Sequence, residues 1–250
     1  MRAMPENSRP DPVPPSPTGT GRRLDGLDAL RGLAMLWMTA YHLCFDLRQF
    51  GWLQGNFYED PFWTVQRSCI VSLFLLCAGL GQAQALAAGQ DARRFWRRWC
   101  QIAACALLVS LGSWWMFPRS YISFGVLHGM AVMLILLRFA AARLPSLPLL
   151  GLSLLALAAP QLWQHSFFDQ RASNWIGLVT HKPITEDYVP LLPWIGVMGL
   201  GLQLGRLSLL VRPWQHGPRP LAWLGRHSLS YYMLHQPVMI GVLMLIGARH

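Results

Sequence analysis

Charge is scarce in this chain. Of its 250 residues only 13% are charged, and 53% are hydrophobic, whereas about 25% of the residues of an ordinary soluble domain are charged. The apolar residues gather in runs of about 17 to 25, the length with which an α-helix crosses a bilayer. The shortage of charge therefore excludes an ordinary soluble domain and predicts an all-α, polytopic membrane helix bundle.

Several chemical signatures are also missing from the sequence. It contains no glycine-rich phosphate loop, no G-x-S-x-G element and no cluster with metal-ligand spacing. No metal cofactor is therefore expected. The five cysteines are odd in number and lie within or at the ends of the apolar runs, so we interpret them as reduced packing residues. They are Cys44, Cys69, Cys77, Cys100 and Cys105.

Lysine is almost absent, since Lys182 is the only one among 21 basic residues, and the net charge is +10. In a soluble protein this balance would suggest a nucleic-acid partner. Here the arginines lie between apolar runs, where basic residues set membrane topology. We therefore expect the lipid bilayer, and no nucleic acid, as a partner.

The expected organisation is a short tail followed by one membrane domain. Residues 1–22 contain six prolines and no apolar run, which predicts a disordered cytoplasmic tail. Residues 23–250 form the membrane domain. Within it, residues 217–225 are interpreted as a short interfacial helix or a partial eighth span. About seven spans are predicted, at 25–47, 63–87, 98–116, 121–138, 146–163, 190–206 and 227–247.

The distribution of arginine predicts an orientation. The tail and alternate loops carry 14 basic residues, while the opposite loops and the carboxyl terminus carry five. The positive-inside rule then places the amino terminus in the cytoplasm and the carboxyl terminus outside. The two remaining basic residues, Arg31 and Arg67, fall inside spans, so topology alone does not explain them.

The first predicted span carries an unusual set of ionisable residues. Arg31 and His42 are eleven residues apart, which puts them on one helix face with a rise of about 16 Å between them. Asp46 lies one turn beyond His42, and Asp28 lies three residues before Arg31. Ionisable groups inside a bilayer are costly and usually face a protein interior or a wet cavity. The first span is therefore predicted to build a site.

Three further polar residues are placed inside later spans. Arg67 is expected about two turns from the outer face, His128 about 10 Å below it, and His235 near the middle of the last span. Alternatives remain open for each. Either histidine would also serve as a hydrogen-bond partner between helices, and Arg67 would reach the outer interface by extending its side chain. Pro237 beside His235 opens a polar notch or only kinks the helix.

Asp28 and Asp46 have alternatives of their own. Asp28 and Arg31 could instead form only a helical ion pair at the membrane surface. Asp46 could instead cap the solvated end of the span. A carboxylate one turn from an imidazole, however, orients it and stabilises its charge. We therefore favour a chemical role for His42.

The longest loop, residues 164–189, is expected outside the membrane. Its charged and aromatic residues suit a polar acceptor such as a sugar, or they form an ordinary solvated loop with tryptophan anchors. They include His165, Asp169, Arg171, His181, Lys182, Glu186 and Asp187, beside Trp163 and Trp175.

A set of segments in a fixed order carries a family resemblance. These are LDGLDALRGLAMLWMTAYH, SLFLLCAGLGQ, RRFWRRW, ISFGVLHGM, YVPLLPWIGVMGLGLQLG and LGRHSLSYYMLHQPV. The set resembles the bacterial branch of the heparan-α-glucosaminide N-acetyltransferase catalytic-domain family, from about residue 23 to the end. The spacing of Arg31 and His42 also looks like that of the wider transmembrane acyltransferases that acetylate sugars.

The resemblance implies an activity and a location. An acyl group would leave cytoplasmic acyl-CoA, such as acetyl-CoA, and reach a hydroxyl or amine of an extracytoplasmic glycan or small polar acceptor. The protein would be a multi-pass enzyme of the cell envelope, in the bacterial inner membrane. Arg31 matches the family's arginine at the start of the first span. His42 matches a position that is histidine in bacterial sugar acetylases and asparagine in the lysosomal enzyme.

One departure from the family changes the expected mechanism. The lysosomal enzyme has its catalytic histidine in the loop after the first span, but the corresponding loop here, RQFGWLQGNFYEDPFW, has none. A covalent acetyl-histidine at that position is therefore excluded. We expect direct transfer in a ternary complex, with His42, oriented by Asp46, as general base.

The remaining predicted roles complete this hypothesis. His128 or Arg67 would stabilise the oxyanion, and His235 is a further catalytic candidate. Forked arginine donors suit the phosphates of CoA. The expected cofactor-binding residues are Asp28, Arg31, Arg93, Arg94, Arg97 and Arg98. A small-solute transporter and a non-catalytic membrane partner protein are the alternatives, and a homodimer is left open.

Overall fold

The computed structural model describes residues 24–207 and 212–247. The predicted tail, residues 1–22, lies outside them. Within the described residues the regular structure is helical and contains no strand, as the composition predicts. The α-helices are α1 (Asp25–Gln49), α2 (Pro61–Ala87), α3 (Ala92–Met116), α4 (Val126–Arg143), α5 (Ser146–Leu162), α6 (Leu191–Arg206), α8 (Arg219–Arg226) and α9 (Ser228–Gly247).

Four of these helices are long and apolar enough to cross a membrane, namely α2, α3, α4 and α9. α5 is apolar but shorter, with 17 residues. α6 has 16 residues, and α1 carries acidic residues in its first turn and Arg48 in its last. The structure is therefore that of a polytopic helix bundle. The count of seven spans and the cytoplasmic amino terminus stay predictions.

Three predicted elements begin elsewhere in the structure. α3 starts at Ala92 rather than at 98, so the arginines predicted in the preceding loop lie on its first turns. α4 starts at Val126 rather than at 121, because the preceding backbone bonds to another loop. Ser120 and Phe124 accept hydrogen bonds through their carbonyl oxygens from the N–H groups of Glu186 and Val189. The segment 217–225 is the helix α8, whose eight residues span about 12 Å and are too short to cross a bilayer.

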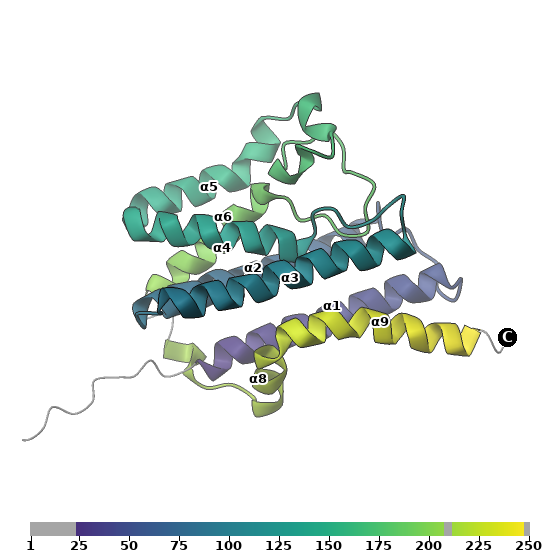
Figure 1. Ribbon diagram of the computed structural model, residues 1–250, viewed down its shortest axis with the longest axis horizontal. Coiled ribbons are helices and arrows are strands. Elements are labelled where there is room, and N and C mark those ends of the chain that lie inside the picture. Colours follow the sequence, from purple (N-terminus) through teal and green to yellow (C-terminus); the bar gives the residue numbers. More distant parts are fainter. Residues whose placement is uncertain (1–23, 208–211, 248–250) are drawn as a thin grey trace, which may run out of the picture.

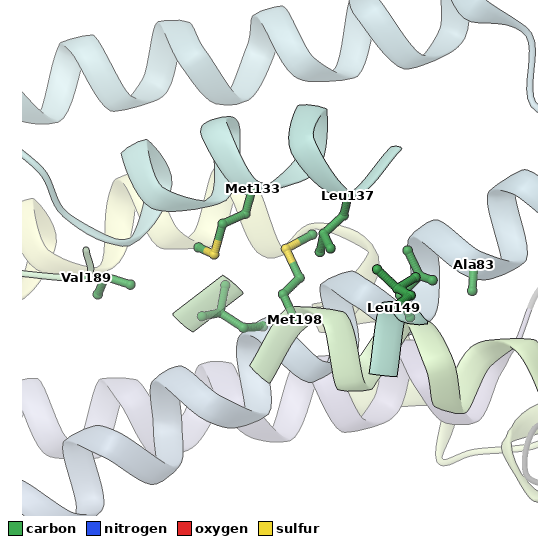
Figure 2. Close-up of a cluster of buried hydrophobic side chains, with 8 residues drawn as sticks. Ala83, Met133, Leu137, Leu149, Val189 and Met198 are labelled. Atoms are coloured by element: carbon green, nitrogen blue, oxygen red, sulfur yellow. The ribbon is translucent and has the colours of Figure 1, made fainter. Parts of the chain in front are cut away.

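The bundle is organised by a few helix pairs. The most extensive contacts join α2 to α6, α1 to α8 and α5 to α6, and α9 lies alongside α1 (Figure 1). The largest buried cluster lies between α2, α4, α5 and α6. Figure 2 shows Met133 and Leu137 of α4 facing Met198 of α6 in that cluster.

Glycine permits the closest of these approaches, between α2 and α6. A Cβ atom on Gly79 would collide with the backbone of Met198 and Leu202, and one on Gly201 would collide with the backbone of Leu76. Small residues at such crossings let the backbones of membrane helices approach closely. The α2–α6 contact therefore depends on glycine from both helices.

Replacing Gly79 with alanine is expected to lower the thermal stability of the purified protein. The clash forces α2 and α6 apart, and overpacking of this kind costs about 1–3 kcal/mol. Gly151 in α5 is the matched control, because a Cβ there meets open space and alanine raises helix propensity by roughly 1 kcal/mol. The effects of Gly79→Ala and Gly151→Ala are measured as unfolding temperatures in detergent. Equal temperatures for the two variants would contradict the close crossing.

Candidate functional site

Two of the three predicted histidines come together between α1 and α9. The ring centroids of His42 and His235 are 5.3 Å apart. The ring of Tyr41 packs edge-on against His42 at 5.8 Å, and the ring of Tyr231 stacks parallel to His235 at 6.0 Å. Helices α1 and α9 run side by side in Figure 1. An imidazole pair with aromatic neighbours therefore stands at the centre of the candidate site.

The hydrogen bonding of His235 fixes its tautomer. Its Nδ1 lies 2.7 Å from the carbonyl oxygen of Tyr232. Since a carbonyl only accepts, Nδ1 carries the proton and Nε2 of the neutral ring carries the lone pair. His235 is buried, and its Nε2 has no hydrogen-bond partner among the described residues. An imidazole nitrogen with a free lone pair is the group that a general base requires.

Asp46 is paired with α9 and not with His42. Its carboxylate oxygens accept hydrogen bonds from Nε2 of Gln236 at 2.8 and 3.0 Å, and the side chain is buried. No hydrogen bond joins Asp46 to His42 in the part of the chain that the structure describes. The predicted orientation of His42 by Asp46 is therefore not observed. Instead, Asp46 ties α1 to the residue that follows His235, one residue before Pro237.

Arg67 lies on α2 beside this centre. It is half-buried, and among residues 24–207 and 212–247 it forms no hydrogen bond or ion pair. Its charge acts on Tyr41 and Tyr58, and on Lys182 and Asp187 of the long loop. Tyr41 contacts the His42 ring, so the charge of Arg67 acts on the neighbourhood of the imidazole pair.

The long loop brings its own charges to this region. The Nζ atom of Lys182 lies 5.5 Å from the centroid of the Tyr58 ring. Lys182 is exposed at the surface, yet partial desolvation by the surrounding atoms lowers its pKa to about 8, and the charge of Arg67 adds to the shift. Burial raises the pKa of Asp187, whose Oδ2 accepts the backbone N–H of Val126 at 2.8 Å. Asp187 also acts electrostatically on Tyr232 of α9, which connects the loop to His235.

His128 lies apart from the imidazole pair and takes the second of its predicted roles, that of a hydrogen-bond partner between helices α3 and α4. Because α4 begins at Val126, His128 lies in the first turn. Its Nδ1 accepts the backbone N–H of Gly125 at 3.3 Å, and its Nε2 lies 3.0 Å from the hydroxyl of Ser110. That hydroxyl donates to the carbonyl oxygen of Ile122, so it accepts from Nε2. Both ring nitrogens thus have partners, and His128 caps α4 rather than joining the imidazole pair.

The predicted cofactor-binding residues lie near the opposite end of α1. Arg31 donates to Asp28 at 2.8 Å, so the helical ion pair is present. Arg31 also reaches the carbonyl oxygen of Cys77 at 3.5 Å. Among the predicted arginines of α3, Arg98 lies close enough for its charge to interact with that of Arg31. All four are exposed on the first turns of α3, and the other three are Arg93, Arg94 and Arg97.

Sequence reasoning left several residues of this region without a role. Lys182 and Asp187 were predicted only as loop residues, and Gln236 only as part of a notch beside Pro237. Two features of the sequence could have drawn attention to them: Lys182 is the only lysine, and Gln236 adjoins a histidine inside a predicted span. Within the described residues no group of three or more His, Cys, Asp or Glu side chains is arranged to hold a metal ion.

A separate groove lies on the α1–α2 surface. It has a volume of about 520 Å³, and its lining includes Trp37, Ser68, Ser72 and Leu76. None of the predicted site residues lines it. We therefore locate the candidate site at the imidazole pair and the neighbouring charges.

Comparison with known proteins decides the family. The family described as heparan-alpha-glucosaminide N-acetyltransferase, catalytic, matches residues 23–237. The chain belongs to this family. The heparan-alpha-glucosaminide N-acetyltransferase match includes His42, Arg67 and His235 and ends at Pro237. No curated protein and no solved structure matches the chain. The chain is thus a member of a membrane acetyltransferase family.

Proposed function

We propose that the protein is an integral membrane acyltransferase that moves an acetyl group from cytoplasmic acetyl-CoA to a hydroxyl or amine of an extracytoplasmic sugar or glycan. Residues 23–250 would form the catalytic domain of a multi-pass protein in the bacterial inner membrane, with a cytoplasmic amino terminus. The family supports the chemistry. The observation that carries the proposal is the buried, unpartnered Nε2 of His235 beside His42.

The geometry favours a particular division of roles. Nε2 of His235 removes the proton from the acceptor as its oxygen or nitrogen attacks the thioester carbonyl carbon. The carbonyl oxygen becomes an oxyanion, and an N–H of the neutral His42 ring is available to donate to it. The carbon–sulfur bond then breaks, and the proton on His235 passes to the departing CoA thiolate. This assigns the role of base to His235, whereas the sequence favoured His42.

The donor would bind along α1. Arg31 and His42 are separated by a rise of about 16 Å, a distance that the extended pantetheine arm of CoA covers. The phosphates would then lie near Arg31 and Arg98, with Arg93, Arg94 and Arg97 contributing positive charge. Arginine suits this task because its forked donors bind phosphate oxygens in pairs. Asp28 would hold Arg31 in place through the observed ion pair.

The proposal is tested by product identification. Purified protein is incubated with acetyl-CoA labelled in the acetyl group and with a cell-envelope extract, and labelled products are isolated. We expect release of free CoA together with a labelled sugar or glycan. Heat-inactivated protein is the control. Absence of both CoA release and labelled product would contradict the enzymatic proposal and leave the transporter and partner-protein alternatives.

A further inference from the structure

Two hydroxyl groups join α1 to α9 beside the imidazole pair. The Oγ1 atom of Thr39 lies 2.8 Å from the carbonyl oxygen of Met35 in its own helix and 2.7 Å from the hydroxyl oxygen of Tyr231. A carbonyl only accepts, so the single hydroxyl proton of the threonine is donated to Met35. The hydroxyl of Tyr231 therefore donates to Thr39, and this hydrogen bond has a fixed direction.

The ring of Tyr231 in turn faces His235. Their centroids are 6.0 Å apart and their planes differ by 7°, a parallel arrangement within the distance range that aromatic pairs prefer. The imidazole is also held at Nδ1 by the carbonyl oxygen of Tyr232. The stacked ring restrains the plane of the imidazole, and the hydrogen bond restrains the direction of its Nδ1–H bond. Together they determine where the unpartnered Nε2 points.

The hydroxyl contact belongs to a series of three contacts between α1 and α9. The α1 members are spaced by three and then four positions, which places them on one helix face. The partners follow in the same order along α9, so the two helices run in parallel. The contacts are Thr39 with Tyr231, His42 with His235, and Asp46 with Gln236. The imidazole pair thus lies between two hydrogen-bonded contacts.

We propose that Thr39 and Tyr231 are positioning residues, and that the hydrogen bond between their hydroxyls fixes the Tyr231 ring against His235 and so keeps Nε2 directed at the acceptor. The inference rests on the proposed acyltransferase function and adds two residues to its site. Both residues act through His235, so their loss should lower kcat and leave the KM for acetyl-CoA unchanged.

A double-mutant cycle tests whether the two hydroxyls act through one bond. Thr39→Val and Tyr231→Phe each remove one hydroxyl and keep the shape of the side chain. Each is expected to reduce kcat about tenfold, less than the 10²-fold cost of a displacement of about 1 Å, because the Tyr232 carbonyl still holds the imidazole. The double variant should be no slower than either single variant, since the second change then removes nothing. A double variant about 100-fold slower than wild type would overturn the inference, because the hydroxyls would then act independently.

Conservative variants separate positioning from loss of packing. Thr39→Ser keeps the accepting hydroxyl and should restore most of the rate, whereas Tyr231→Leu removes the stacked ring and should be slower than Tyr231→Phe. Thr64→Val is the matched control, because Thr64 on α2 also donates to backbone carbonyl oxygens one turn earlier, but in the described chain it bonds to no other helix. A rate in Thr39→Ser as low as that in Thr39→Val would contradict the proposed role of the hydroxyl.

A spectroscopic measurement reports on His235 without acetyl transfer. Nitrogen-15 NMR of histidine-labelled protein in liposomes distinguishes protonated from unprotonated ring nitrogens at alkaline pH, where imidazole is neutral. The signals of His235 are assigned by their absence in His235→Ala. Wild type should carry the proton on Nδ1 only, and Thr39→Val and Tyr231→Phe should show both tautomers, because the ring is then free to turn from the Tyr232 carbonyl. Tyr188→Phe loses a hydroxyl hydrogen bond of 2.7 Å in the long loop and should keep the wild-type spectrum.

The outcomes separate this inference from the proposed function. Wild-type tautomer and wild-type kcat in Thr39→Val and Tyr231→Phe would overturn the positioning role and leave the acyltransferase standing, even if both variants unfold at a lower temperature, since the bond would then be purely structural. Mixed tautomers in both variants of a protein that transfers no acetyl group would support the positioning role and refute the acyltransferase. A size-exclusion profile identifies any variant that does not fold, and Thr39→Ser then carries the test.

Discussion

Replacing His235 with alanine is expected to reduce acetyl transfer by a factor of about 10²–10⁴, the usual contribution of a general base. The expectation follows from the hydrogen bond of Nδ1 to the Tyr232 carbonyl oxygen, which leaves Nε2 as the proton acceptor. Initial rates with saturating acetyl-CoA measure the effect. His227→Ala is a suitable control, because His227 is exposed and bonds only within its own turn.

The same experiment distinguishes His235 from His42. In wild type the transfer rate should rise with pH on the acidic side of its pH profile, as the base loses its proton. This rise should be absent in His235→Ala. Loss of His42 should lower kcat by about 10²–10³ through the oxyanion and preserve that rise. If His235→Ala keeps the wild-type profile while His42→Ala loses the acidic limb, the roles are reversed and the original sequence-based assignment of His42 is correct.

Replacing Asp46 with alanine is expected to reduce the transfer rate by about 10²-fold, the effect of displacing a catalytic group by about 1 Å. The buried carboxylate receives both hydrogen bonds of the Gln236 amide. Without it, the hydrogen bond between the hydroxyls of Thr39 and Tyr231 still joins α1 to α9, but α9 loses the polar contact directly after His235, where Pro237 already removes a backbone donor. Asp46 is thus a positioning residue, and the thermal stability should fall together with the rate.

Asp46→Asn separates this role from direct catalysis. Asparagine still offers one oxygen to Gln236, so its rate should stay within about tenfold of wild type and its pH profile should not change. A carboxylate that orients a catalytic imidazole behaves differently, because its asparagine variant loses a factor of about 10⁴. A loss of that size in Asp46→Asn would show that Asp46 acts on a histidine and not on the helix contact.

Sequence reasoning recovered the helices because each carries a long apolar run. It misplaced the start of α4, since the segment before Val126 forms hydrogen bonds with a loop more than 60 residues later. Helical periodicity contains no information about such a partner. The same limit explains His128, whose cap on α4 depends on where that helix begins.

The candidate site was predicted in part. The burial cost of ionisable groups pointed to His42, Arg67 and His235, and the structure brings the rings of His42 and His235 together. Helical spacing suggested that Asp46 faces His42, but spacing within one helix does not determine which of two helices a side chain bonds to. Lys182 meets Tyr58 and Asp187 meets Val126 only through the folding of the long loop, and no periodic pattern marks them.

Transfer across a sealed membrane would demonstrate the proposed catalysis in a single assay. Protein is reconstituted into liposomes with labelled acetyl-CoA outside and glucosamine inside. We expect labelled acetylated sugar in the lumen and one free CoA outside for each product, with both lost in His235→Ala. Movement of the sugar across the membrane without CoA release, or equal product from His235→Ala, would contradict the proposed catalysis.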